Sequence, residues 1–179
     1  GGLLNTATQC KIIVGVAGLS AAQLAKITFT GYIPGASITA SGELVPFVNA
    51  YFSTGSVAPN VLTNWKTERD GTGTSPANFT SGVFFVIQNT HTMTTSANWS
   101  VSGTNSKVWI ESGGSLVANN PISLAASSTL QIEDNGTYIH NNTGTPASTI
   151  FAGTENFGSK SNFIINNWVN NNTAFTTGV

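Results

Sequence analysis

The chain has few charged residues and a single cysteine. Only 7% of its 179 residues are charged, with 6 Lys and Arg against 7 Asp and Glu, whereas about 25% is usual in soluble domains. Six basic residues are too few to line a phosphate backbone or to attach the chain to anionic lipid, so neither nucleic acid nor a membrane surface is expected as a partner. No run of about 20 apolar residues is present that could insert into a membrane. Cys10 cannot form an internal disulfide, so we expect packing and hydrogen bonds to stabilise the fold.

Apolar residues make up 40% of the chain and glycine contributes 19 residues, which favours a folded protein over a disordered one. The scarcity of Lys and Arg leaves few sites for trypsin-like proteases, which fits an extracellular, cell-surface location. Asn-x-Ser/Thr sequons also recur, but a chain so rich in Asn and Thr generates them by chance.

An internal repeat of about 22 residues fills the second half of the chain. Residues 106–120 align with 128–142 without a gap, and residues 85–101 align with 108–124 at an offset of 23. Within each copy apolar residues alternate as in a strand with one inward face, and pairs of Gly or Asn separate these runs. A unit of this length, built of short strands and tight corners, predicts one coil of a parallel β-helix. We therefore expect an all-β fold in which residues 61–179 form a β-solenoid of three to four coils that continues beyond the chain.

Stacked coils place equivalent residues in columns along the solenoid axis, one strand spacing apart. The alignment predicts one buried column, formed by Ile87, Ile110 and Ile132. It also predicts asparagine ladders at a corner, whose amides hydrogen-bond from coil to coil. The residues of these ladders are Asn119 with Asn141 and Asn120 with Asn142.

A predicted outward column is too apolar for a free surface. It comprises Val86, Trp109, Gln131 and Ile164. We expect another part of the protein or a partner to cover this face, and we include Trp65 among the candidate interaction residues because exposed tryptophans bind glycans. An aromatic residue in a solenoid is nevertheless more often buried. Glu111 and Glu133 share a further column, and we expect both carboxylates to face water because they would otherwise repel each other.

Residues 1–60 do not show the repeat. They contain strand-like runs and one short helical candidate over residues 20–26, with Ser20 placed to cap it. The end of a solenoid is an open sheet edge that needs a cap. We therefore expect residues 1–60 to form a small β-rich cap or flanking layer.

A motif with a fixed order of elements follows this segment. It consists of residues 64–80 (NWKTERDGTGTSPANFT), 85–89 (FVIQN) and 97–103 (ANWSVSG). The motif and the repeats after it resemble a recurring module of very large secreted surface proteins of Bacteroidota, over residues 64–168. The resemblance implies export by the type IX route and a role at the cell surface as a stalk, adhesin or matrix component.

The sequence shows no convergent set of catalytic residues. The two histidines, His91 and His140, fall in different columns of the repeat. Asp70 and Thr72 resemble half of a calcium loop but lack its closing bidentate Glu, so a plain turn is favoured over calcium and no other cofactor is expected.

The sequence therefore favours a non-enzymatic structural or adhesive segment. Its expected partners are other protein chains, the remainder of a longer surface protein, or glycans. Two alternatives stay open, namely a fragment of a carbohydrate-active β-helix enzyme and a viral or phage fibre.

Overall fold

The computed structural model describes residues 11–24, 26–29, 35–46, 50–143 and 153–167, which belong to two compact units that divide between Asn49 and Ala50. Cys10 lies outside the described residues. Within those residues strands predominate, and no helix has the length and hydropathy needed to cross a membrane.

The first unit contains a short helix, α1 (Ala21–Leu24), and an antiparallel pair of strands, β1 (Ala36–Ile38) and β2 (Leu44–Pro46). Ser20 precedes α1 and caps it, because its hydroxyl accepts a hydrogen bond from the backbone N–H of Gln23. The Gln23 side chain in turn accepts one from the backbone N–H of Ser20.

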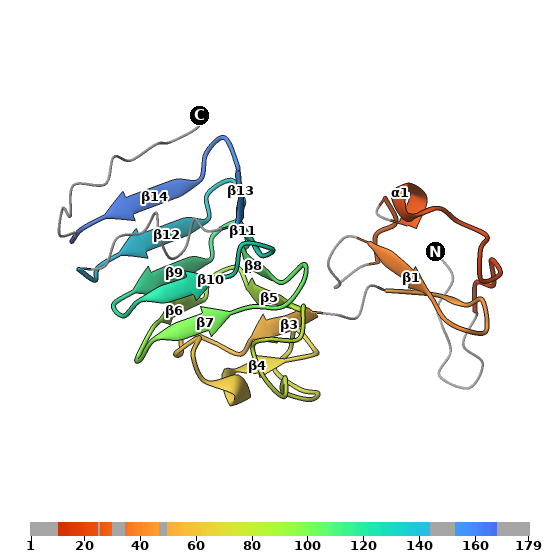
Figure 1. The fold of residues 1–179 in the computed structure, drawn as a ribbon, viewed down its shortest axis with the longest axis horizontal. Helices are drawn as coiled ribbons and strands as arrows, with labels where there is room; N and C mark the ends of the chain where they lie inside the picture. Colours follow the sequence, from red (N-terminus) through yellow and green to blue (C-terminus); the bar gives the residue numbers. More distant parts are fainter. Residues whose placement is uncertain (1–10, 25, 30–34, 47–49, 144–152, 168–179) are drawn as a thin grey trace. The chain divides into compact units, whose positions relative to one another are not determined.

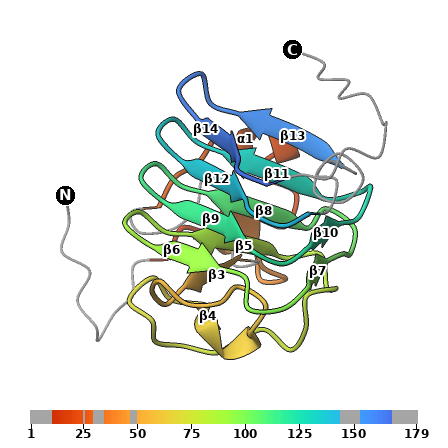
Figure 2. The same cartoon turned by 90° about the vertical axis from the view of Figure 1, so that its left-hand side faces the viewer.

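The second unit is a parallel β-helix, which confirms the predicted fold class (Figures 1 and 2). Its first sheet has the order β13-β11-β8-β5-β3-β4, its second sheet the order β14-β12-β9-β6, and its third sheet pairs β10 with β7. The strands of the first sheet are β3 (Ala50–Ser53), β4 (Trp65–Lys66), β5 (Phe84–Ile87), β8 (Lys107–Ile110), β11 (Thr129–Ile132) and β13 (Thr154–Phe157). Those of the second are β6 (Thr92–Thr94), β9 (Ser115–Ala118), β12 (Thr137–His140) and β14 (Asn162–Ile165), and those of the third are β7 (Trp99–Val101) and β10 (Ile122–Leu124).

The inward side chains of successive coils stack in columns. Ile87 pairs with Ile110 and Ile110 with Ile132, and all three are buried. Met93, Leu116 and Tyr138 form an equivalent buried column in the second sheet. Each coil places its apolar residues at equivalent positions along its strands. One continuous apolar core therefore runs through the stack of coils.

An aromatic cluster fills the end of the core near β3 and β4. Trp65 packs against Phe85 with ring centroids 5.1 Å apart and stacks on Trp99 at 5.8 Å. Phe79 contacts both Phe85 and Trp99. These four rings belong to the motif of residues 64–103, so that motif builds the closed end of the solenoid core.

The antiparallel strand β4 and the short 3-10 helix η1 (Leu62–Asn64) lie at this same end of the first sheet. Strand β3 pairs in parallel with β5 and is the first strand of the solenoid sheet. The boundary between the two units after Asn49 therefore differs from the division after residue 60 expected from the sequence, and residues 50–66 cap the core from within the second unit.

Candidate functional site

The outer face of the first sheet holds the apolar column expected from the sequence, with one correction. Phe52, Val86, Trp109, Gln131 and Asn156 are successive Cα partners in this column. Ile164 is not part of it, because it lies in β14 of the second sheet and pairs with Ile139. Val86 has no exposed surface and Trp109 is 8% exposed, so neither is a free contact surface.

The loop of residues 67–74 lies against this column. It is closed by a hydrogen bond from the Thr67 N–H to the Thr74 carbonyl. Arg69 extends from the loop with its guanidinium carbon 4.4 Å from the centre of the Phe52 ring. The same guanidinium donates to both carboxylate oxygens of Glu111, at 2.5 and 3.1 Å. We call this arrangement the Arg69 clasp.

Gln88 completes the clasp. Its side-chain N–H group donates to the backbone carbonyls of Ser53 and Arg69, and its side-chain oxygen accepts from Arg69 at 3.3 Å. The clasp thus joins the loop to β3, to the end of β5 and to the residue after β8. A bidentate Arg–carboxylate pair with a stacked ring is among the stronger arrangements of this kind.

The expectation that Glu111 and Glu133 both face water is wrong. The Glu111 side chain is 16% exposed and pairs with Arg69. The Glu133 carboxylate accepts hydrogen bonds from the indole N–H of Trp109 at 2.8 Å and from the backbone N–H of Ser112 at 3.1 Å. Each carboxylate therefore has its own donors, which offsets their mutual repulsion.

Lys107 covers the other side of Trp109. Its ammonium lies 5.0 Å from the centre of the Phe84 ring and 5.2 Å from that of Trp109, and it donates to the side-chain oxygen of Gln131 at 3.0 Å. Burial lowers the pKa of Lys107. With Lys107 on its ring and Glu133 on its N–H, Trp109 is a packed residue.

Trp65 is also a packed residue, which corrects its assignment to an interaction surface. It has no exposed surface, and its indole N–H donates to the carbonyl of Pro59 at 2.7 Å. Its rings contact Phe85 and Trp99 in the aromatic cluster.

Asp70 and Thr72 form a turn. One oxygen of the Asp70 carboxylate accepts from both the backbone N–H and the hydroxyl of Thr72, at 2.9 and 2.6 Å. In the part of the chain that the structure describes, no group of three or more His, Cys, Asp or Glu side chains is placed to hold a metal ion. The geometry of these two residues is that of an Asx-turn.

We expect the Thr72→Val variant to raise the pKa of Asp70. The hydroxyl of Thr72 lowers that pKa because it stabilises the charged carboxylate, and valine removes the hydroxyl while keeping a branched side chain. A carbon-detected NMR titration of the Asp70 carboxyl measures the change. Because the pKa of Asp70 is lower in the folded state, ionised Asp70 slightly stabilises the fold at neutral pH. This contribution is lost as the pH falls through the pKa of Asp70 in the folded state. An unchanged titration curve in the variant would contradict this assignment.

Both histidines pair with hydroxyl groups. The Ser53 hydroxyl lies 2.7 Å from Nδ1 of His91, and it also accepts from the backbone N–H of Gln88. The Tyr138 hydroxyl lies 3.1 Å from Nδ1 of His140, and burial raises the pKa of Tyr138. Ser53 is fully buried, so its hydroxyl does not face a substrate site in this structure.

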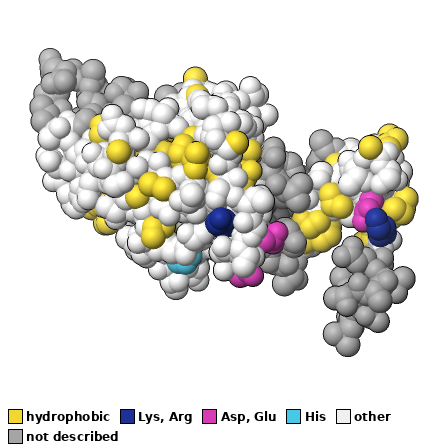
Figure 3. Space-filling view, turned by 90° about the horizontal axis from the view of Figure 1, so that it is seen from below, with side chains coloured by type: hydrophobic (Ala, Val, Ile, Leu, Met, Phe, Trp, Pro, Cys, Tyr) yellow, Lys and Arg dark blue, Asp and Glu magenta, His cyan; other side chains and the backbone are white. Residues whose placement is uncertain are grey.

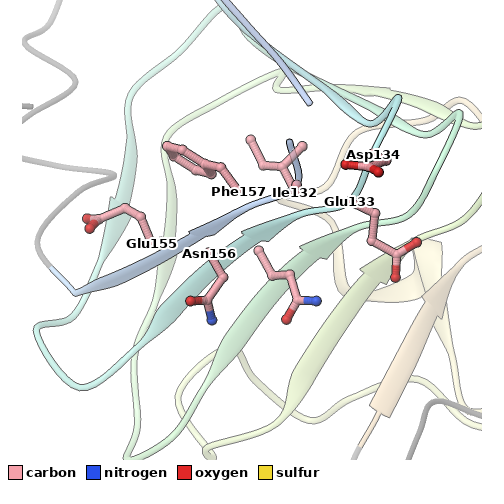
Figure 4. A pocket seen from close by; sticks show the side chains of 8 residues that line it. Ile132, Glu133, Asp134, Glu155, Asn156 and Phe157 are labelled. Carbon is pink, nitrogen blue, oxygen red and sulfur yellow. The ribbon is translucent and has the colours of Figure 1, made fainter. Parts of the chain in front are cut away.

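An open groove of about 670 Å³ follows the edge of β11 and β13 in the last coil. Its acidic residues are Glu133, Asp134 and Glu155. Figure 4 shows Glu155 at the opposite end of the groove from the other two, and Asn156 on the other side of β13 from Phe157. Asp134 accepts from the backbone N–H of Lys160 and so supports the neighbouring corner. The groove therefore does not bring two carboxylates face to face, as hydrolysis of a glycosidic bond requires.

The outer face of the second sheet is different, because regular rows of side chains cover it. Cα pairing and the alternation along each strand place two columns, and side-chain hydrogen bonds align a third just beyond the strands; we call the three together the three-column face. The first column is polar and comprises Thr92, Ser115, Thr137 and Asn162. The second bears methyl groups and comprises Thr94, Val117, Ile139 and Ile164. The third follows the ends of the strands and comprises Asn119, Asn141 and Asn166.

The side chains of the three-column face are solvent-accessible and uncharged. All eleven residues are exposed or half-buried, and Ile164 is 41% exposed. The strands that bear them lie one above another (Figure 2). Seen from below, most of the surface of the described residues is white, the colour of the backbone and of side chains that are neither hydrophobic nor charged, with scattered hydrophobic patches (Figure 3). We take this face as the candidate functional site, because among the described residues it presents accessible side chains in regular rows.

The third column is an asparagine ladder. The Asn141 amide donates to the Asn119 side-chain oxygen at 3.0 Å, and the Asn166 amide donates to that of Asn141 at 2.7 Å. Asn120 and Asn142 act differently, since each donates to a backbone carbonyl of the neighbouring coil, at Thr95 and Ala118 respectively. Side-chain hydrogen bonds thus reinforce the backbone ladder at this corner.

Replacing Asn141 by alanine should lower the free energy of unfolding by about 1–2 kcal/mol, since it removes two exposed side-chain hydrogen bonds, each in the lower part of the range of roughly 0.5–1.5 kcal/mol. The Asn119→Ala variant removes one of these two bonds and should cost about half as much. Urea unfolding followed by circular dichroism measures both. Equal losses in the two variants would show that the bonds do not act as a ladder.

Part of this arrangement leaves no trace in the sequence pattern. The repeat alignment places the asparagine pairs, but the Arg69 clasp and the Ser53–His91 contact join residues 42 and 38 positions apart. The sequence places Glu111 directly after a repeat strand but gives no indication that Arg69 is its partner.

Comparison of the chain with protein-family models, curated proteins and solved structures finds no match.

Proposed function

We propose that the chain is a non-enzymatic structural and adhesive segment of a secreted bacterial surface protein. In this role a stiff solenoid presents the three-column face to an external partner. The resemblance of residues 64–168 to surface-protein modules of Bacteroidota supports export by the type IX route, and the low content of Lys and Arg suits an extracellular setting.

The observation that supports this role best is the uninterrupted stacking of the coils. The isoleucine column, the backbone ladders of the first two sheets and the asparagine ladder all extend over successive coils. Each inner strand is bonded to a strand above and a strand below, so no coil bends or shifts without breaking several hydrogen bonds. Such nearest-neighbour coupling makes a solenoid a stiff element.

Two measurements test the proposal. Hydrogen exchange should show slow exchange for the backbone amides of β8, β9, β11 and β12 as one continuous band, because these strands are bonded on both sides. An antibody against the purified chain should label intact cells of the source organism without permeabilisation. Rapid exchange in these strands would refute the stiff segment, and labelling only after permeabilisation would refute the surface location.

A further inference from the structure

We propose that the three-column face binds an extended, neutral polysaccharide chain that lies along the solenoid axis. The inference rests on the proposed adhesive role and assigns the chemical class of the partner. The inference starts from the order of chemical groups across the face. A row of hydroxyls or amides is followed by a row of methyl groups and then by a second row of amides.

This pattern matches the chemistry of a pyranose ring. A sugar ring has an apolar C–H surface and hydroxyl groups around its rim. Val117, Ile139 and Ile164 offer an apolar strip for the C–H surface, and they lie between two polar rows that can reach the hydroxyls on either side. A few well-placed polar groups around an apolar surface are the usual basis of small-ligand recognition.

The polar rows retain hydrogen-bonding capacity. An asparagine amide has two N–H donors and an oxygen with two lone pairs, and the ladder bonds use one N–H and one lone pair of Asn141. In the first column, Asn162 donates to the Thr137 hydroxyl at a long 3.4 Å, which leaves the Thr137 hydroxyl proton available to an acceptor.

The repeat distance also suits a polymer. Neighbouring coils are spaced by ~4.8 Å, which is roughly the advance of one sugar unit in an extended β-linked chain. Three successive coils each present a polar group, a methyl-bearing side chain and an asparagine amide, at residues 115–119, 137–141 and 162–166. Each coil can therefore offer one sugar unit an apolar contact that lies between two rows of hydrogen-bonding groups.

The size and charge of the face favour a neutral glycan over a second copy of this chain and over an anionic polymer. From the strand spacing and the rise per residue, the face covers on the order of 250 Å², whereas a stable dimer needs about 800 Å² from each partner. A second copy of this chain would therefore be held too weakly by this face alone. Since none of its eleven residues is ionisable, the face offers no counter-charge to an anionic polymer.

The test is an NMR titration of the full chain with cellohexaose, chitohexaose and mannohexaose, with hexagalacturonate as the charged counterpart. At least one neutral probe should shift the resonances of Val117, Ile139 and Ile164 with a Kd of about 1 mM or tighter, without dependence on salt. The Ile139→Glu variant should weaken that binding by about tenfold or more, because it places a carboxylate in the methyl row. Its matched control is Thr129→Glu, on the outer face of the first sheet in the same coil, and it should leave the Kd unchanged within about twofold.

Three results would overturn the assignment. They are no shift with any neutral probe at about 10 mM, binding of hexagalacturonate as tight as that of the neutral probes, and a concentration-dependent dimer in sedimentation that the Ile139→Glu variant abolishes. The last result would assign the face to a second copy. Ile139→Ser serves as a second variant should the glutamate variant fail to fold. None of these results would alter the hydrogen-exchange band or the surface labelling, so the structural role is tested separately.

Discussion

Replacing Phe85 by alanine is expected to lower the free energy of unfolding by about 3–5 kcal/mol, the usual cost of truncating a fully buried phenylalanine. Phe85 has no exposed surface and contacts the rings of Trp65, Phe79 and Trp99 at centroid distances of 5.1, 5.1 and 6.1 Å. The cavity would open at the closed end of the core, beside Trp65, which is itself fully buried.

The matched control is Phe157→Ala, the same substitution at a side chain that is 47% exposed, and we expect it to cost no more than about 1 kcal/mol. Urea titrations followed by tryptophan fluorescence report both variants. If Phe85→Ala cost no more than Phe157→Ala, the aromatic cluster would not be the main stabilising feature of that end.

The second large effect concerns the Arg69 clasp. We expect Arg69→Ala to lower the free energy of unfolding by about 1–3 kcal/mol, because it leaves the mostly buried Glu111 carboxylate without its cation and uncovers the Phe52 ring. The estimate is below the range for fully buried pairs because the Arg69 side chain is 29% exposed.

Two further variants separate charge from geometry. Arg69→Lys keeps the charge but loses the planar, bidentate contact, so it should recover less than half of the loss. The double variant Arg69→Ala with Glu111→Gln should show a coupling energy of about 1–2 kcal/mol, measured by chemical unfolding of all four proteins. Strictly additive losses would mean that the two side chains stabilise the fold independently.

The solenoid was predictable because a parallel ladder repeats its chemistry. Ile87, Ile110 and Ile132 occupy one column, so the same requirement for an apolar, β-branched residue acts on each coil and appears as an offset of 22 to 23 residues in the sequence. The asparagine pairs at the corner follow from the same alignment. The sequence repeat is therefore sufficient to predict most of the fold of residues 84–142.

The assignment of Ile164 to the outer face of the first sheet is wrong for a physical reason. Strand β13 has the sequence Thr-Glu-Asn-Phe, all of it exposed, with a carboxylate at Glu155 opposite the buried Leu130. Without apolar alternation it has no strand signature, so the alignment passed over it and assigned Ile164 to the first sheet. Only backbone pairing reveals that β13 occupies that position.

The candidate site was partly visible. Alternation along residues 115–119 and 137–141 marks which side chains point outward, but Ile164 joins the methyl row only when β14 is placed over β12. The clasp was not predictable, since a single arginine in a loop has no periodic neighbours to indicate its partner. Trp65 was misassigned because a tryptophan in a glycine-rich motif looks the same in sequence whether it is buried or exposed.

The pairing of β12 with its two neighbours has a consequence for how such chains diverge. Thr137 lies 22 residues after its partner Ser115, but Asn162 lies 25 residues after Thr137, and the strands keep the same pairing in both cases. Differences in the length of chain between paired strands are therefore accommodated without displacing the rows on the outer face. Homologues of this chain should differ in coil length while preserving the rows of the three-column face, so they are better compared strand by strand than by a fixed sequence period.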